Sequence, residues 1–318
     1  MKTSRRQFVK RSAAGLAGLS AIGLGGRLAT AETPPPVERR KFGKIGAEVS
    51  ILGLGLGSAF TRPFSEDPEK AHAILEKALD AGINYWDTSF NYSDSENTIA
   101  PVVEKHRDRI YLVSKSAQRS YDGFRRELET SLRRLKTDRI DLYHLHNLKP
   151  KDDLVAMESG AYRAIREAKE EGLIGAFGIT GHSGARVLME AIERFDPDAL
   201  LTVFPADRPD GGAYEDELLP MAVERDMGIV GMKTVKHARN SDLQGADLIR
   251  YALSLEGVAS VIVGLDSEAH LTENVAMASN FVPMESASQA AMTKEVQGAL
   301  AGTIAPWDVP GYEDGRIA

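Results

Sequence analysis

Four polar side chains stand at or just beyond the ends of three successive apolar stretches, and together they could act on one substrate. Asp87 closes the first stretch and Tyr92 follows it, Lys115 closes the second, and His146 closes the third. Consecutive parallel strands lie side by side, and their carboxyl ends point to the same edge. If the three stretches are such strands, we expect the four side chains to converge on one point.

This set has the composition of a site that transfers a proton to an oxygen atom. A tyrosine phenol has a pKa near 10 and is a poor acid at neutral pH. A nearby ammonium stabilises the phenolate and makes the proton easier to release, while a carboxylate keeps that ammonium charged and fixed. A histidine can orient a carbonyl oxygen by hydrogen bonding. The carbon then requires a hydride donor, which implies a nicotinamide cofactor.

The histidines permit a second interpretation. His144 and His146 are two residues apart on one stretch and therefore face the same side of a strand, a spacing that suits metal ligands. His182 ends the next apolar stretch, and Asp266 could add a carboxylate. A metal-dependent barrel hydrolase that activates water is thus the alternative. It leaves the carboxylate, phenol and ammonium of the first set without a role.

The elements that must position these residues alternate regularly between strand and helix patterns. The expected strands span residues 49–57, 83–89, 109–115, 140–147, 174–181, 199–205, 228–235 and 258–265. Such alternation implies parallel strands with buried faces. The length suits a (β/α)₈ TIM barrel, whose active site lies at the carboxyl ends of the strands. A doubly wound open sheet is the alternative fold.

Two additions to the barrel are expected. Residues 37–49 have the pattern of a short N-terminal hairpin that turns near residues 43–46. Residues 286–301 predict an extra C-terminal helix, followed by a terminal loop that carries Trp307 and Tyr312. We expect one barrel domain over residues 39–318.

The N-terminus differs in composition from the rest of the chain. Residues 4–10, SRRQFVK, match the twin-arginine export pattern, a short apolar run follows, and residues 29–31 offer a small-x-small cleavage site. Residues 1–31 are therefore expected to be a Tat signal peptide and residues 32–38 a linker. The expected partner is the Tat machinery and the expected location is the periplasm or another exported compartment.

Charge and composition exclude several classes of protein. The 318 residues carry 39 basic and 46 acidic side chains and no cysteine. Removing residues 1–31 with their six basic side chains leaves 287 residues and a net charge of −13. Nucleic-acid binding needs a basic surface and is not expected.

The absence of cysteine excludes disulfides and thiolate metal sites. We expect no membrane span after cleavage, because the apolar run is shorter than a span requires.

Five motifs, in order over residues 38–280, resemble those of the aldo/keto reductase family. Residues 82–96, GINYWDTSFNYSDSE, are similar to its G-x-x-x-x-D-T-A-x-x-Y-G-x-S-E signature. The others are similar to its strand-three lysine, its I-D-L-Y-x-x-H motif, its I-G-V-S element and its last cofactor segment, and they lie at 112–115, 140–147, 175–180 and 261–264 with 273–274. The resemblance implies NAD(P)-dependent interconversion of a carbonyl compound (aldehyde, ketone or sugar) and an alcohol.

By position, the resemblance assigns the catalytic residues. Tyr92 matches the proton donor, Lys115 and Asp87 the residues that tune it, and His146 the residue that positions the substrate carbonyl. NADP(H) or NAD(H) is the implied cofactor, with no metal. The implied cofactor-binding residues are Gly57, Ser58, Asp87, Thr180, Met232, Lys233, Gly264, Asp266, His270 and Asn274.

Several positions depart from the family pattern. The strand-six glutamine is absent, and Met232 and Lys233 replace the Tyr-Ser pair after strand seven. We expect Met232 to pack against the nicotinamide and Lys233 to reach the pyrophosphate. Asp266 and Glu268 stand where NADP-preferring members place basic residues. Since a carboxylate repels a 2′-phosphate but accepts from a 2′-hydroxyl, we expect NAD(H) to bind at least as well as NADP(H).

Overall fold

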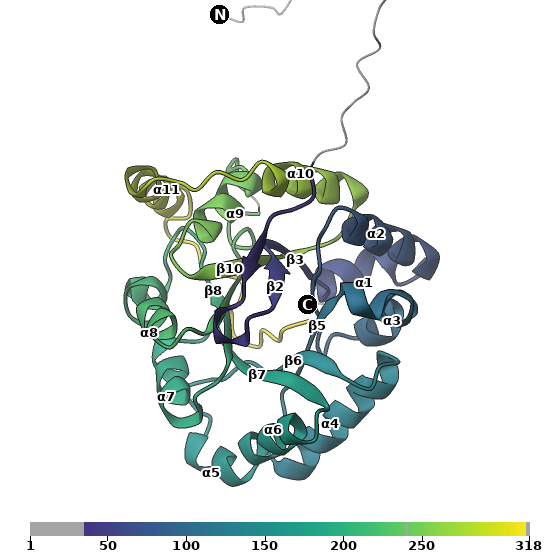
Figure 1. The fold of residues 1–318 in the computed structure, drawn as a ribbon. Helices are drawn as coiled ribbons and strands as arrows, with labels where there is room; N and C mark the ends of the chain where they lie inside the picture. The colour runs from purple at the N-terminus through teal and green to yellow at the C-terminus, as the bar shows by residue number, and fades with distance from the viewer. Residues whose placement is uncertain (1–34, 240, 316–318) are drawn as a thin grey trace, which may run out of the picture. The chain divides into compact units, whose positions relative to one another are not determined.

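Eight parallel strands close into a barrel (Figure 1), and this confirms the (β/α)₈ TIM barrel over the open sheet. The computed structural model describes residues 35–239 and 241–315, so the expected signal peptide lies outside the described residues. Around the barrel each strand pairs with the next along the chain, and the last, β10, closes the ring against β3. The strands are β3 (Leu52–Gly55), β4 (Tyr85–Asp87), β5 (Tyr111–Ser116), β6 (Ile140–Leu145), β7 (Ile174–Thr180), β8 (Ala199–Val203), β9 (Gly228–Met232) and β10 (Val258–Gly264).

Helices surround the strands and cover the outer face of the barrel (Figure 1). Helix α2 shows why they form: Asp67 caps it by accepting a hydrogen bond from the Lys70 amide at 3.0 Å, and Pro68 opens its first turn. The helices are α1 (Ser58–Phe64), α2 (Pro68–Asp80), α3 (Ser95–His106), α4 (Tyr121–Arg134), α5 (Leu154–Ser159), α6 (Ala161–Glu170), α7 (Ala185–Phe195), α8 (Leu219–Glu224), α9 (Gly245–Leu253), α10 (Glu268–Ser279) and α11 (Ser286–Ala299). Helix α11 is the expected extra C-terminal helix.

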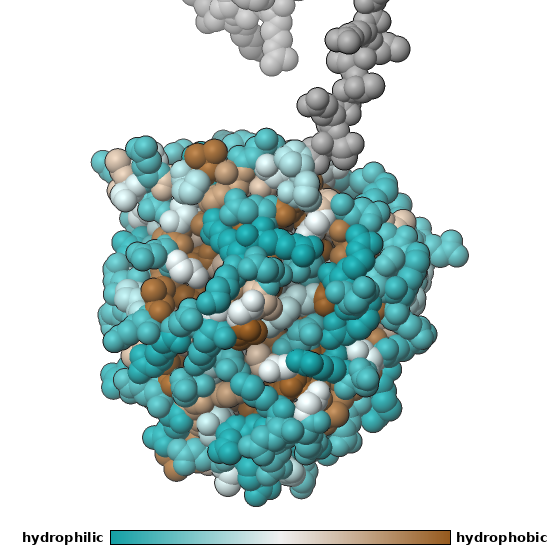
Figure 2. All heavy atoms as spheres, viewed as in Figure 1, coloured by the Kyte–Doolittle hydropathy of each residue, from teal (hydrophilic) through white to brown (hydrophobic). Residues whose placement is uncertain are grey.

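The expected hairpin closes the amino-terminal end of the barrel. Its strands β1 (Arg39–Lys41) and β2 (Glu48–Ser50) pair antiparallel, and Phe42 follows β1 directly in the sequence. The Phe42 ring is fully buried and lies 5.8 Å from the ring of Tyr85 and 5.6 Å from that of Tyr111. Tyr85 and Tyr111 begin β4 and β5, so the hairpin plugs the end opposite the expected site. On the face shown in Figure 2, hydrophilic side chains predominate and hydrophobic ones are scattered.

The carboxyl-terminal end of the barrel is occupied by the chain's own tail. After α11, residues 300–315 return as a loop, drawn in yellow, which runs back across the ring of strands (Figure 1). Trp307 is buried in the main core, and Tyr312 packs against it. Among the described residues, no helix has the length and apolar character needed to cross a membrane.

Candidate active site

A buried ion pair joins β4 to β5 at the carboxyl end of the barrel. The Lys115 ammonium lies 2.6 Å from Asp87 Oδ1 and donates a second hydrogen bond, of 2.7 Å, to the carbonyl of Thr88. Both charged side chains are only 1% exposed. A buried ammonium needs such a partner, because burial of an unpaired charge is costly. The pair therefore fixes the Lys115 ammonium at the centre of the site.

Tyr92 lies over this ion pair on the loop between β4 and α3. The loop is tight, because the Tyr92 amide donates to the carbonyl of Ser89 at 3.0 Å. The Lys115 ammonium lies 4.8 Å from the centre of the Tyr92 ring. The His146 ring meets the same ring edge-on, with centroids 5.6 Å apart. The structure thus brings all four residues of the predicted catalytic set together.

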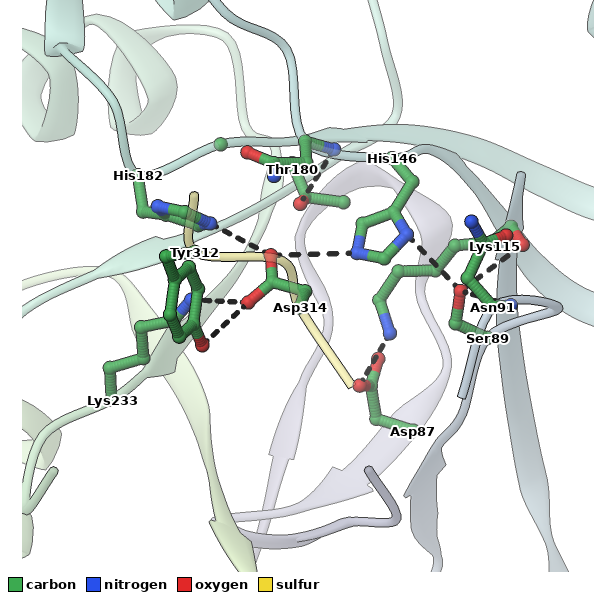
Figure 3. Close-up of polar contacts among 12 residues, drawn as sticks. Asp87, Ser89, Asn91, Lys115, His146, Thr180, His182, Lys233, Tyr312 and Asp314 are labelled. Carbon is green, nitrogen blue, oxygen red and sulfur yellow. Dashed lines mark hydrogen bonds and ion pairs between the residues drawn. The ribbon is translucent and has the colours of Figure 1, made fainter. Parts of the chain in front are cut away.

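His146 is held from two sides and is uncharged. Ser89 Oγ lies 3.1 Å from Nδ1 of the imidazole, and Arg119 donates to the His146 carbonyl at 3.0 Å. Burial, assisted by the positive charge of Lys115, lowers the pKa of His146 to about 3. The ring is therefore neutral at physiological pH and can hydrogen-bond through Nε2, which points toward the centre of the site (Figure 3).

The tail brings a carboxylate, Asp314, into this site (Figure 3). One of its oxygens, Oδ2, lies 2.7 Å from Nε2 of His182 and 3.7 Å from Nε2 of His146. The other, Oδ1, lies 2.6 Å from the Lys233 ammonium and accepts from the Tyr312 hydroxyl at 3.0 Å. Although burial opposes ionisation, Lys233 and His182 hold the pKa of Asp314 well below its usual range. The docked carboxylate is therefore ionised.

The docked tail changes the expected acidity of Tyr92. Gly315 packs against the phenol ring so closely that a Cβ there would lie 2.1 Å from Cδ1 of Tyr92. Burial raises the pKa of Tyr92 well above its usual value, and the carboxylates of Asp314 and Asp87 add to the shift. The sequence, which shows only Lys115 near the phenol, predicts the opposite: a lowered pKa for Tyr92. With the tail docked, burial and the nearby negative charges make Tyr92 hold its proton more tightly.

The residues proposed as metal ligands do not form a common site. His144 is fully buried in the barrel, and Asp266 pairs with His270. His182 instead binds the tail through Asp314. Within residues 35–239 and 241–315, no three histidine, aspartate or glutamate side chains are grouped as metal ligands. The donor geometry that the hydrolase requires is therefore not present in the described part of the chain.

The residues implied as cofactor ligands lie at the carboxyl-terminal end of the barrel or on the helices that follow. Gly57 is the N-cap of α1, which Ser58 begins, and Thr180 ends β7. The other implied ligands lie at the end of β9 or β10, directly after one of these strands, or on α10. They are Met232, Lys233, Gly264, Asp266, His270 and Asn274. Lys233 differs from expectation in one respect: its ammonium is buried against Asp314, in the same pocket as His182.

Sequence reasoning missed two members of this site. Asp314 carries no local signal, since it lies in a terminal loop without periodicity and its partners are 132 and 81 residues away, at His182 and Lys233. Ser89 could have been found, because it follows Asp87 by two residues at the same strand end and so faces the same pocket.

The fold and the cluster at its carboxyl-terminal end define a barrel oxidoreductase. The sequence profile of the aldo/keto reductase family matches residues 51–247. The chain belongs to the aldo/keto reductase family and is an NAD(P)-dependent oxidoreductase. It is 27% identical to the oxidoreductase YqkF of Bacillus subtilis, across 75% of this chain and 90% of that protein. It is also 27% identical to L-galactose dehydrogenase of Arabidopsis thaliana, across 76% of this chain and 88% of that one.

Solved structures give the same assignment. A crystal structure of an aldo-keto reductase from Pseudomonas aeruginosa superposes with a TM-score of 0.64 and 32% identity, covering 76% of this chain and 94% of that one. An aldo-keto reductase from Klebsiella pneumoniae, solved in complex with NADPH, has a TM-score of 0.65 at 21% identity and covers 81% and 95% of the two chains. This second likeness concerns the fold alone.

Proposed function

We propose that the protein interconverts a carbonyl compound and its alcohol, with Tyr92 as general acid in reduction and general base in oxidation. The observation that carries the proposal is the convergence of Tyr92, Lys115 and His146 around one point, with the Lys115 ammonium 4.8 Å from the phenol ring and the imidazole at its edge. No nucleophile or paired catalytic carboxylate is needed for this chemistry.

Each residue has a separable task in this proposal. His146, neutral and fixed by Ser89, donates a hydrogen bond from Nε2 to the substrate carbonyl oxygen. Tyr92 gives its proton to that oxygen as the carbon is reduced. Lys115 stabilises the phenolate that remains, and Asp87 keeps Lys115 charged and in place. The docked Asp314 carboxylate is one of the charges that raise the pKa of Tyr92, so departure of the tail removes part of this shift.

The residues present fit a nicotinamide dinucleotide. Asp87 uses Oδ1 for Lys115, while Oδ2 is buried and lacks a hydrogen-bond partner. A buried carboxylate oxygen in that state is suited to accept from a ribose hydroxyl. Thr180 at the end of β7 offers a hydroxyl for the carboxamide, and Met232 offers an apolar contact for the ring. When bound, the nicotinamide supplies or accepts the hydride.

We expect NAD(H) to bind at least as tightly as NADP(H). Asp266 and Glu268 follow β10, and the side chains of His270 and Lys77 already contact them. The 2′-phosphate of NADP(H) would therefore meet two carboxylates and no uncommitted cation among these four side chains. Fluorescence titration with NADH and NADPH, followed by turnover with a panel of aldehydes, ketones and sugars, checks both the cofactor and the activity.

Two outcomes would contradict these expectations separately. NADPH binding about a hundredfold tighter than NADH would overturn the cofactor preference. Cofactor binding without turnover of any carbonyl or alcohol would overturn the proposed activity. The variant Glu268→Lys serves as a control, because it adds a cation beside Asp266 and should shift the preference toward NADP(H).

We further propose that the protein is exported by the Tat pathway. The support is the sequence of residues 1–31, with Arg5 and Arg6 ahead of an apolar run and a small-residue cleavage site. Cell fractionation is expected to recover the shortened protein in the periplasm. Replacing both arginines with lysine should retain the full-length chain in the cytoplasm, and equal export of this variant would contradict the proposal.

A further inference from the structure

The docked tail reveals an anion-binding pocket beside the catalytic residues. We call the set His146, His182 and Lys233 the carboxylate pocket, since all three face the Asp314 carboxylate (Figure 3). Their side chains are only 4%, 1% and 8% exposed, respectively. They lie one or two residues beyond the ends of three different strands, β6, β7 and β9, so the carboxyl-terminal end of the barrel builds the pocket.

The charges in this pocket require an anion. The ammonium groups of Lys115 and Lys233 are both almost fully buried, and Lys115 is already neutralised by Asp87 at 2.6 Å. The counter-ion of Lys233 is Asp314 of the tail, also at 2.6 Å. A buried ammonium that loses the counter-ion it directly contacts is strongly destabilised. A molecule that replaces the tail and again excludes water from Lys233 keeps this ammonium charged if it brings a negative charge of its own.

The tail also lies where a substrate must bind. Asp314 Oδ2 is 3.7 Å from His146 Nε2, the atom assigned to the substrate carbonyl. Gly315 covers the ring of Tyr92. A carbonyl compound cannot reach Tyr92 while these residues stay in place, so the tail must leave for turnover. Its departure exposes the carboxylate pocket to the incoming molecule.

We propose that the carboxylate pocket binds a carboxylate of the substrate, so that the substrate is a short oxo acid and its product the corresponding hydroxy acid. This inference rests on the proposed carbonyl–alcohol activity. The spacing sets the length: an oxygen of the docked carboxylate lies within 3.7 Å of the nitrogen that orients the carbonyl. The carboxylate of the substrate therefore sits on the carbon next to the carbonyl, or one carbon further.

The reaction balances without any change at the carboxylate. The carbonyl carbon gains a hydride from the reduced nicotinamide, and the C=O double bond becomes a single bond. The oxygen gains the proton of Tyr92, which bulk water then restores. Lys233 and His182 hold the carboxylate throughout, and Asp314 returns to them when the hydroxy acid leaves.

Matched substrate pairs test the inference. The mature protein is assayed with pyruvate and glyoxylate and with their methyl esters, which keep the carbonyl but lose the charge. We expect kcat/KM for the acids to exceed that for the esters by about tenfold or more, because hydrogen bonds to charged groups are the stronger ones. Lys233→Gln should reduce this ratio by about tenfold. Asp314→Asn should lower KM for the acids, since the intramolecular competitor loses its charge.

A control and the contrary outcomes complete the assay. Lys294→Gln makes the same change at an exposed lysine on α11, outside the carboxylate pocket, and is expected to keep the ratio of the wild type. Esters reduced as well as acids would overturn the substrate class while leaving the carbonyl reductase activity intact. If Lys233→Gln weakens NADH binding and leaves the acid-to-ester ratio unchanged, Lys233 serves the cofactor, and the inference is again wrong.

A binding measurement separates the pocket from the chemistry. Oxamate, an unreactive analogue of pyruvate, is titrated by calorimetry into the wild type and both variants in the presence of NADH. We expect tighter binding to Asp314→Asn than to the wild type, and loss of binding in Lys233→Gln. Oxamate binding without turnover of any carbonyl would overturn the proposed function but support the pocket. No oxamate binding to Asp314→Asn would overturn the pocket.

Discussion

Replacing Tyr92 with phenylalanine is expected to lower kcat by about 10²–10⁴-fold, the usual contribution of a positioned general acid. The substitution deletes one oxygen and keeps the ring that contacts Lys115 and His146. The fold and cofactor affinity should therefore be unchanged. Steady-state turnover, with the affinity for NADH measured in parallel, checks this expectation.

A second tyrosine at the same end of the barrel provides a matched control. Tyr312 points its hydroxyl at Asp314 and accepts a hydrogen bond from Lys236 at 2.6 Å, but it belongs to the tail that must leave. Tyr312→Phe is expected to keep kcat within the same order of magnitude. Wild-type turnover in Tyr92→Phe would show that another group delivers the proton.

Replacing Lys115 with methionine is expected to abolish turnover and to destabilise the fold. Asp87 would remain as a buried carboxylate with neither oxygen paired to a cation, and breaking a buried ion pair on one side costs about 3–5 kcal/mol. Burial already raises the pKa of Asp87 despite the opposing charge of Lys115. The phenolate of Tyr92 would also lose its nearest cation. Urea unfolding and steady-state kinetics measure the two effects.

The double variant Lys115→Met/Asp87→Asn separates stability from catalysis. Removing both charges leaves no uncompensated carboxylate, so we expect most of the lost free energy of unfolding to return. Activity should not return, because neither the ammonium nor its anchor is present. Recovery of both stability and turnover in the double variant would show that Lys115 is only structural.

The strands and the catalytic set could be predicted because both depend on local pattern. Apolar runs fixed the places of all eight strands, and the barrel topology then brings their carboxyl ends together. Asp87, Lys115 and His146 were placed by that rule, and the structure brings them together with Tyr92. Boundaries were less accurate: β4 is only three residues long, because the chain turns into the site directly after Asp87.

The tail could not be predicted in the same way. Asp314 reaches its partners only after the whole barrel and α11 have folded, and no periodic pattern marks such a contact. The effect on Tyr92 was missed for the same reason, since the expectation included Lys115 but not a carboxylate from the C-terminus. The interpretation of Lys233 as a pyrophosphate ligand likewise followed its position in sequence, whereas its ammonium faces Asp314.

The two ends of the barrel differ in how they tolerate attachment of a tag, dye or surface linker. The hairpin seals the amino-terminal end with Phe42, far along the strands from His146 and Lys233. The other end of the described chain, Gly315, touches the reactive phenol ring itself. A group attached to the side of the chain near Gly315 would therefore disturb the reaction centre, whereas one attached on the hairpin would lie at the opposite end of the strands.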